Sequence, residues 1–213
     1  MCIAERQARR HRPRAEHGVS LVELIVFIVI VSIGVAGVVG ALSMATRAST
    51  DPMIQKQALA IAEALLEEVQ LQPFTYCDPD DPNAASATSA AGCTGGAGGP
   101  NDENLLVLGQ LGPEAGETRT SATSPFDNVS DYNAFCMGPG PGCLGPAITD
   151  LTGAAIPGLG NYTASVTVVN QALGAIPASD ALLITVTVLG PTGTNTTVVL
   201  HGYRVRYAPN ALP

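Results

Sequence analysis

The sequence contains no tryptophan and only three histidines, and charged residues make up 13% of its 213 positions. Basic residues are scarce beyond the first 14 positions, which hold five of the ten, and the formal net charge is −8. An acidic surface repels phosphate backbones, so nucleic-acid binding by the body of the protein is not expected. The chain also lacks a nucleophile–base constellation and the cysteine or histidine spacing of a zinc site. We therefore expect neither an enzyme nor a bound cofactor.

One segment is rich in the apolar residues that cross membranes. Residues 21–45 form an apolar run of 25 residues with a single charge, Glu23. At about 1.5 Å per residue such a helix is roughly 37 Å long, which is enough to cross a bilayer core of about 30 Å. The basic cluster precedes this run. The positive-inside rule therefore places residues 1–17 in the cytoplasm and the chain after about Thr46 outside it.

Two simpler interpretations of this segment remain open. A secretory signal peptide has an apolar region of only about 7–15 residues, but the sequence at 43–45 resembles a cleavage site, with a cut after Ala45. A plain single-pass anchor is the other alternative. Neither interpretation explains Glu23, because a carboxylate inside an apolar helix is costly unless it has a partner. A free α-amine, created by a cut just after Gly18, would be a natural partner.

The sequence GVSLVE at residues 18–23 follows a basic leader and begins the long apolar helix. In this position it resembles the processing motif of type IV prepilins and pseudopilins. The resemblance implies that prepilin peptidase cuts between Gly18 and Val19 and that the new amine of Val19 is methylated. It also implies that Glu23 pairs with the terminal amine of a neighbouring subunit, so that the two charges neutralise each other among apolar helices.

Later stretches resemble minor pilins of the mannose-sensitive haemagglutinin (MSHA) pilus, of the MshD type. These stretches are residues 51–69 with 74–75, residues 126–132 and residues 202–207. The resemblance implies a low-abundance subunit that helps to initiate, assemble or cap a pilus. Its partners would be other pilins or pseudopilins through the N-terminal helix, prepilin peptidase, and the inner membrane before assembly. The alternatives are a minor pseudopilin of a type II secretion system and a membrane-anchored or secreted adhesin.

Residues 51–71 have the pattern of an amphipathic helix. Asp51 and Pro52 are typical of a helix start, as the N-cap and the first helical position. Apolar residues then recur at intervals of three and four, at positions 54, 58, 61, 62, 65 and 69. We expect this helix to end before Pro73 and, because of the break at Pro52, to continue the membrane helix with a kink.

Beyond Gly160 the apolar pattern changes to a period of two. It predicts strands at about 162–170, 182–189 and 196–207, with a turn at 191–195 that joins the last two as a hairpin. We expect an α+β, pilin-like fold in which one long N-terminal helix, transmembrane and then amphipathic, packs on a small antiparallel sheet with disulfide-closed loops. The expected parts are a cleaved cytoplasmic leader (1–18), a transmembrane or filament-core helix (19–46), an amphipathic helix (47–72) and a periplasmic or extracellular domain (73–213) with its sheet at about 162–207.

Four of the five cysteines remain after removal of the leader, namely Cys77, Cys93, Cys136 and Cys143. An even number outside the cytoplasm suggests two disulfides, for which there are three connectivities. We favour Cys77–Cys93 and Cys136–Cys143, because each pair brackets a loop rich in glycine, proline or alanine that has little else to hold it.

Acidic residues in two loops are the remaining candidates for a site. Asp78, Asp80 and Asp81 offer the oxygen ligands that calcium prefers, but the interleaved prolines and the lack of EF-hand spacing favour a solvated acidic loop without metal. We expect Asp127 and Asp131 to cap or brace a turn around Tyr132, with a metal-binding role as the less favoured alternative.

Overall fold

The structure is a computed structural model that describes residues 20–103 and 111–210, with the backbone alone at residues 45–51. By their internal contacts the residues divide into two compact units, Met1–Ala48 and Ser49–Pro213. The elements, in chain order, are α1 (Leu21–Leu71), η1 (Ala90–Gly92), η2 (Ser130–Tyr132), β1 (Cys136–Met137), β2 (Thr163–Asn170), η3 (Ala178–Asp180), β3 (Ala181–Leu189) and β4 (Thr197–Val205).

Helix α1 runs without interruption through Pro52. The amphipathic helix therefore continues the apolar helix, as predicted, but Asp51 lies inside α1 and is not an N-cap. Proline removes one backbone N–H donor and crowds one carbonyl of the preceding turn, so it disturbs a helix locally. The hydrogen bonds of the turns before and after it are unaffected, and a long helix can include the residue.

The part of α1 in the second unit buries one stripe. Ile61, Ala62 and Leu65 are buried, as are Ala58 and Val69 one turn to either side. Glu63 and Glu67 lie on the exposed side. This confirms the amphipathic pattern. The helix ends at Leu71, as predicted, because Pro73 cannot continue it.

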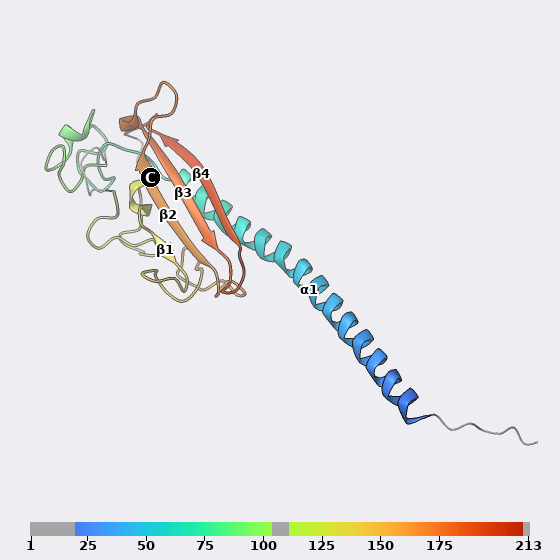
Figure 1. Ribbon diagram of the computed structural model, residues 1–213. Helices are drawn as coiled ribbons and strands as arrows, with labels where there is room; N and C mark the ends of the chain where they lie inside the picture. Colours follow the sequence, from blue (N-terminus) through green and yellow to red (C-terminus); the bar gives the residue numbers. More distant parts are fainter. Residues whose placement is uncertain (1–19, 104–110, 211–213) are drawn as a thin grey trace, which may run out of the picture. The chain divides into compact units, whose positions relative to one another are not determined.

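The sheet is an antiparallel meander in which the strands lie in chain order, β1-β2-β3-β4 (Figure 1). The three long strands agree with the predicted ranges to within two residues at each end. The hairpin between β3 and β4 is also confirmed, because the Gly190 N–H donates to the carbonyl of Thr196 over 2.9 Å. Strand β1 was not predicted, since only Cys136 and Met137 pair with β2.

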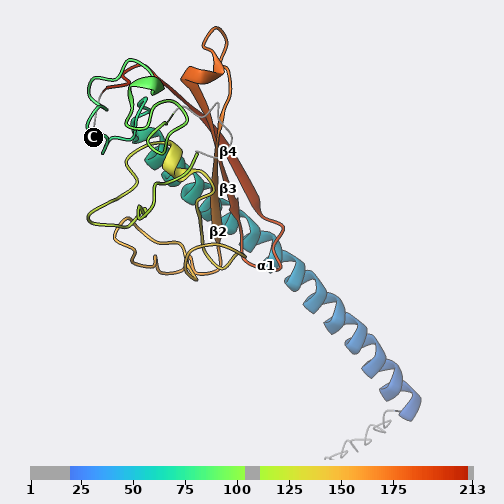
Figure 2. The same ribbon diagram turned by 90° about the vertical axis from the view of Figure 1, so that its left-hand side faces the viewer.

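Alternate residues of β2 and β3 form the inner face of the sheet. On β2 these are Ala164, Val166 and Val168, and all are fully buried. Figure 2 shows the sheet of the second unit nearly edge-on. The part of α1 in this unit and the loop-rich middle of the chain lie on the same side of the sheet. One continuous apolar core joins the helix stripe, the inner face of the sheet and side chains of residues 111–159, which we call the middle segment.

The middle segment contributes large aromatic side chains to this core. Phe126, Tyr132 and Phe135 pack edge-to-face, with ring centroids 5.0 to 6.0 Å apart. Val129 beside them is fully buried. Because these rings fill the space between the helix and the sheet edge, the loops that carry them are fixed without regular secondary structure.

Strand β4 ends two residues before the predicted limit because Arg206 turns away from the ladder. Its backbone N–H donates to the carbonyl of Asp180 over 2.9 Å. Its guanidinium group lies 3.8 Å from the ring centroid of Phe74 and 4.6 Å from that of Tyr76. It also pairs with the Asp180 carboxylate at 3.1 Å. These contacts tie the C-terminal end of the sheet to the segment that follows α1.

The structure contains the two disulfides that the sequence favoured. Cys77–Cys93 has a Cα–Cα distance of 5.4 Å, and Cys136–Cys143 one of 4.6 Å. The first pair is buried with Ala84 and Ala87 in a small second core. The second closes the short loop that follows β1.

Gly138 in this short loop is expected to tolerate no side chain. Its φ is +103°, and an added Cβ would lie against the carbonyl oxygen of Tyr162 and 2.9 Å from the Cα of Thr163. We expect Gly138→Ala to lower the free energy of unfolding by about 3 kcal/mol. Gly142→Ala is the matched control, because Gly142 also has positive φ, +79°, but open space around it, and should cost only about 1 kcal/mol. Urea denaturation of the purified proteins measures both values, and equal losses would contradict the steric argument.

Candidate functional site

The first part of α1 has an exposed apolar surface. Leu21–Met44 is 24 residues long with a mean hydropathy of 2.9, and none of its most apolar window is buried. The exposed fractions of Phe27 and Ile33 are 63% and 69%. By length and composition this segment can cross a membrane. Such a surface is stable when lipid or other apolar helices cover it.

Glu23 is the single charge in this segment and lies in the first turn of α1. The Leu24 N–H donates to the carbonyl of Ser20 over 3.1 Å, so helical bonding starts at the first described residue. No described lysine or arginine forms an ion pair with the Glu23 carboxylate. Gly18 and Val19 lie outside the described residues, so cleavage and methylation stay predictions.

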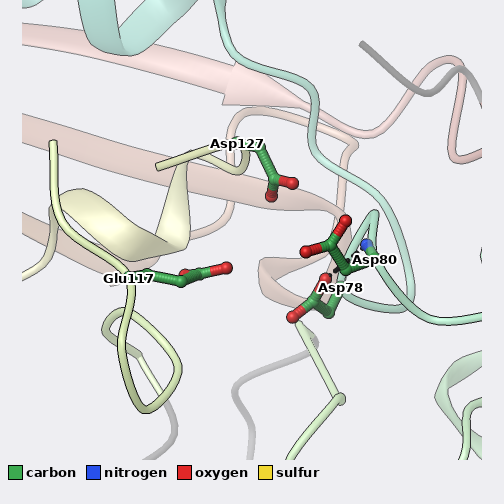
Figure 3. A group of neighbouring side chains, drawn as sticks. All are labelled: Asp78, Asp80, Glu117 and Asp127. Atoms are coloured by element: carbon green, nitrogen blue, oxygen red, sulfur yellow. Dashed lines mark hydrogen bonds between the residues drawn. The ribbon is translucent and has the colours of Figure 1, made fainter. Parts of the chain in front are cut away.

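A second candidate site lies in the loops of the second unit, where seven carboxylates meet. We call them the acidic cluster: Asp78, Asp80, Glu103, Glu114, Glu117, Asp127 and Asp131. They form three overlapping groups, within each of which one oxygen per residue lies within 4.8 Å of the others. Figure 3 shows the first group, Asp78, Asp80, Glu117 and Asp127, with its side chains directed toward a common space. The other groups are Asp78, Glu103 and Glu114, and Glu114, Glu117 and Asp131.

Local turns position these side chains. The Asp80 N–H donates to Oδ1 of Asp78 over 2.5 Å, which folds the Asp-Pro-Asp sequence into a tight turn. The Glu114 N–H donates to Oε2 of Glu117 over 3.1 Å, so these two residues form one turn. The Glu103 N–H donates to the carbonyl of Tyr76 over 3.0 Å and lies beside the Asp78 turn. Polar turns with short side chains thus bring acids from separate segments together.

Asp131 braces the turn before Tyr132, as predicted. Its Oδ2 accepts the N–H groups of Asp127 and Asn128 over 2.9 and 2.7 Å. Asp127 contributes only its backbone to this turn, and its carboxylate belongs to the acidic cluster. The structure therefore separates the roles of two residues that the sequence treated alike.

Asp81 does not belong to the cluster, although the sequence grouped it with Asp78 and Asp80. Its carboxylate accepts the N–H groups of Asn83 and Thr94, each over 2.7 Å. The prediction of a solvated acidic loop is wrong for Asp78 and Asp81, which are 4% and 3% exposed. The reason is that the loop closed by the Cys77–Cys93 disulfide folds back over this segment.

The acidic cluster has no basic partner among the described side chains. Arg119 is the single basic residue between positions 73 and 135, and it is engaged elsewhere. Its Nε and one terminal nitrogen donate to the two carboxylate oxygens of Glu68 over 2.6 and 2.8 Å. The other terminal nitrogen donates to the carbonyls of Thr149 and Asp150, each over 3.1 Å.

Burial and mutual repulsion make the ionised form of these acids unfavourable. Burial, with the charge of Glu103, raises the pKa of Asp131 to about 8. Burial, with the charge of Asp78, raises the pKa of Asp127 to about 7. The pKa of the Glu114 carboxyl is raised for the same reasons, burial first and then the adjacent Glu103. The cluster therefore favours either bound protons or a bound cation.

A pocket of about 600 Å³ is a separate feature of the second unit. Its ionisable lining residues are Glu68, Arg119 and Asp150. The first two form the ion pair described above, and Asp150 accepts hydrogen bonds from Thr152 and the Ala154 N–H. The rest of the lining is largely apolar and comes from α1 and the segment 137–159. The ion pair between Glu68 and Arg119 at this pocket holds the middle segment against the helix.

Sequence reasoning missed Glu103, Glu114 and Glu117. Their segments have no periodicity that predicts an element, so nothing indicated that their side chains would meet those of Asp78 and Asp127. A signal was present in the charge distribution, because nine acidic residues face one basic residue between positions 78 and 131. Acids concentrated in this way without counter-charges favour a shared cation.

Comparison with known proteins identifies the N-terminal segment. The family described as the prokaryotic N-terminal methylation motif matches residues 13–39, which include Gly18, Val19 and Glu23. No curated protein and no solved structure matches the chain. The motif supports a type IV pilin-like or pseudopilin protein, and with the apolar helix it suggests a membrane-anchored one. It also supports processing by prepilin peptidase and interactions with other subunits.

The acidic cluster is expected to make the metal-free protein less stable at alkaline pH. The pKa values of Asp127 and Asp131 are raised from the ordinary value of about 3.9 to about 7 and about 8. The folded state then binds more protons than the unfolded chain, and its stability falls as the pH rises through these values.

Melting temperatures with a chelator at about pH 5.5 and about pH 8.5 measure this effect. Asp131→Asn should reduce the decrease in melting temperature between the two pH values. Asp150→Asn is the control and should leave it unchanged, because hydrogen bonds from Thr152 and Ala154 lower the pKa of Asp150, which then titrates below this range. A melting temperature that rises with pH in the wild type would contradict the prediction.

Proposed function

We propose that the chain is a minor type IV pilin, a structural subunit that takes part in the initiation, assembly or capping of an MSHA-like pilus. The observation that carries the proposal is the N-terminal methylation motif at residues 13–39, which overlaps the exposed apolar part of α1. Such a helix can lie in the inner membrane before assembly and then pack among the helices of other subunits.

Glu23 has a specific role in this proposal. After a cut between Gly18 and Val19, the terminal amine of a neighbouring subunit would approach the Glu23 carboxylate. The two opposite charges remove the cost of either one among apolar side chains. Because the carboxylate is the single charge in Leu21–Met44, it also fixes the axial register of one subunit against the next.

The body of the protein supports the finer assignment through three stretches that resemble MSHA minor pilins. The Tyr132 hydroxyl donates to Oε1 of Glu68 over 2.8 Å, which joins the second stretch to the first. The Arg206 guanidinium group of the third stretch lies over the Phe74 ring. The matching stretches thus contact one another in and around the core, where sequence requirements are strictest.

A minor pseudopilin of a type II secretion system is the alternative that the same motif favours. Both assignments describe a structural subunit rather than an enzyme. An adhesin with an intact leader, or one released by a cut after Ala45, would not need Glu23. The mature N-terminus therefore separates these alternatives.

The mature chain is expected to begin at Val19 in cells that have prepilin peptidase and at Met1 in cells that lack it. Intact-mass measurement and N-terminal sequencing of the purified protein give both results and detect the methyl group. A start at Met1 in both strains would make the protein an ordinary membrane anchor. A start at Thr46 would make it a secreted protein, and either result would overturn the proposal.

Glu23→Ala is expected to leave cleavage normal and to reduce incorporation into filaments strongly, because only the pairing between subunits is removed. The measurement is the amount of this subunit in sheared, purified filaments relative to the amount in the membrane fraction. Glu63→Ala is the matched control, since it removes an exposed carboxylate from the same helix outside the apolar segment. Equal incorporation of wild type and Glu23→Ala would exclude the pairing role.

A further inference from the structure

One buried oxygen in the acidic cluster receives no hydrogen bond from the part of the chain that the structure describes. Asp131 is only 1% exposed. Its Oδ2 accepts two backbone N–H groups, but its Oδ1 accepts no hydrogen bond from any described residue. A buried carboxylate oxygen without a partner is unfavourable and calls for a ligand that supplies positive charge.

This oxygen belongs to a carboxylate that other acids surround. One oxygen each of Asp131, Glu114 and Glu117 lie within 4.8 Å of one another. Opposite ligands of a calcium ion are about 4.6–5.2 Å apart, twice the calcium–oxygen distance. One ion can therefore contact all three residues. Glu117 also belongs to the group in Figure 3, so the two groups are adjacent.

We propose that the acidic cluster binds calcium. The ligands are the six carboxylates of the two groups that share Glu117, namely Asp78, Asp80, Glu114, Glu117, Asp127 and Asp131. Glu103 lies beside them and accepts a hydrogen bond from the Ser130 hydroxyl, which holds the inner side of the site.

The chemistry of the ligands selects calcium among the common cations. All of the candidate ligands are hard carboxylate oxygens, without the thiolates or imidazoles that zinc prefers. They come from irregular loops, which suit the variable geometry of six to eight ligands around calcium. Magnesium requires a near-ideal octahedron and usually keeps several waters, so adjacent groups of carboxylates on irregular loops are poorly matched to it.

A calcium ion here would connect segments that none of the described strands or helices joins. Residues 78–80 follow α1, residues 114–117 belong to the middle segment, and residues 127–131 lead into η2. The ion would neutralise the repulsion among these acids and hold the three loops together. Because the ligands converge only in the folded protein, calcium is expected to raise the melting temperature.

Isothermal titration of the full-length protein in detergent micelles with calcium chloride, after removal of metals with a chelator, tests the proposal. We expect saturable binding with Kd at or below about 1 mM, the weak limit of extracellular calcium modules. Asp127→Asn and Asp131→Asn should each weaken binding by about tenfold or more, because each removes one ligand charge. The melting temperature of the wild type should rise with calcium, and that of both variants should rise less.

Asp150→Asn is the control, since Asp150 is an aspartate outside the acidic cluster whose carboxylate accepts hydrogen bonds within its own turn, from Thr152 and Ala154, and calcium affinity should be unchanged. Loss of calcium binding in Asp131→Asn has misfolding as a second explanation, because the Asp131 carboxylate braces a turn. Asp127→Asn does not have this ambiguity, because no described residue donates a hydrogen bond to the Asp127 carboxylate. Absence of saturable binding by the wild type up to about 10 mM calcium would overturn the proposal. An equal loss of affinity in Asp150→Asn, or equal affinity for magnesium, would also overturn it.

Discussion

The packing of one stripe of α1 against the inner face of β2 and β3 is the interaction on which the second unit depends. Neither element can stand alone, because a meander of short strands and a single helix each leave an apolar face in water. Ala58 and Ala62 are small enough to let the helix approach closely, while Leu65 and Val69 belong to the same buried core as Val166 and Ile184. Burial of these side chains supplies the main driving force for folding.

The loop-rich middle of the chain is positioned by the same core. Phe126, Tyr132 and Phe135 enter it from the side, and the ion pair between Arg119 and Glu68 attaches the preceding segment to the helix. With its one basic side chain directed to the helix, this segment has no described cation near its acids. The carboxylates of these loops therefore have no counter-charge from Arg119, because its guanidinium group is bound to Glu68.

The sequence predicted the regular part of this structure well, because periodicity reports directly on burial. The helix stripe, the three long strands and the β3–β4 turn all follow from which residues face the core. Two features escaped this reasoning. Asp51 and Pro52 lie inside α1 rather than at a helix start, since a proline breaks one hydrogen bond but leaves the flanking turns intact. The acidic cluster depends on the approach of residues as distant in sequence as Asp78 and Asp127, and loops have no period from which such contacts can be derived.

Glu23 and the acidic cluster present the same physical problem in two different units. In each case a carboxylate occupies a place where its ionised form is unfavourable, in an apolar helix or among other buried acids, and no described basic side chain compensates it. A protein that keeps such groups needs positive charge from outside its described residues. For Glu23 the source we propose is the amine of another subunit, and for the acidic cluster it is a calcium ion. Both proposals place the missing positive charge outside the side chains of this chain, in a neighbouring subunit for Glu23 and in a bound ion for the acidic cluster.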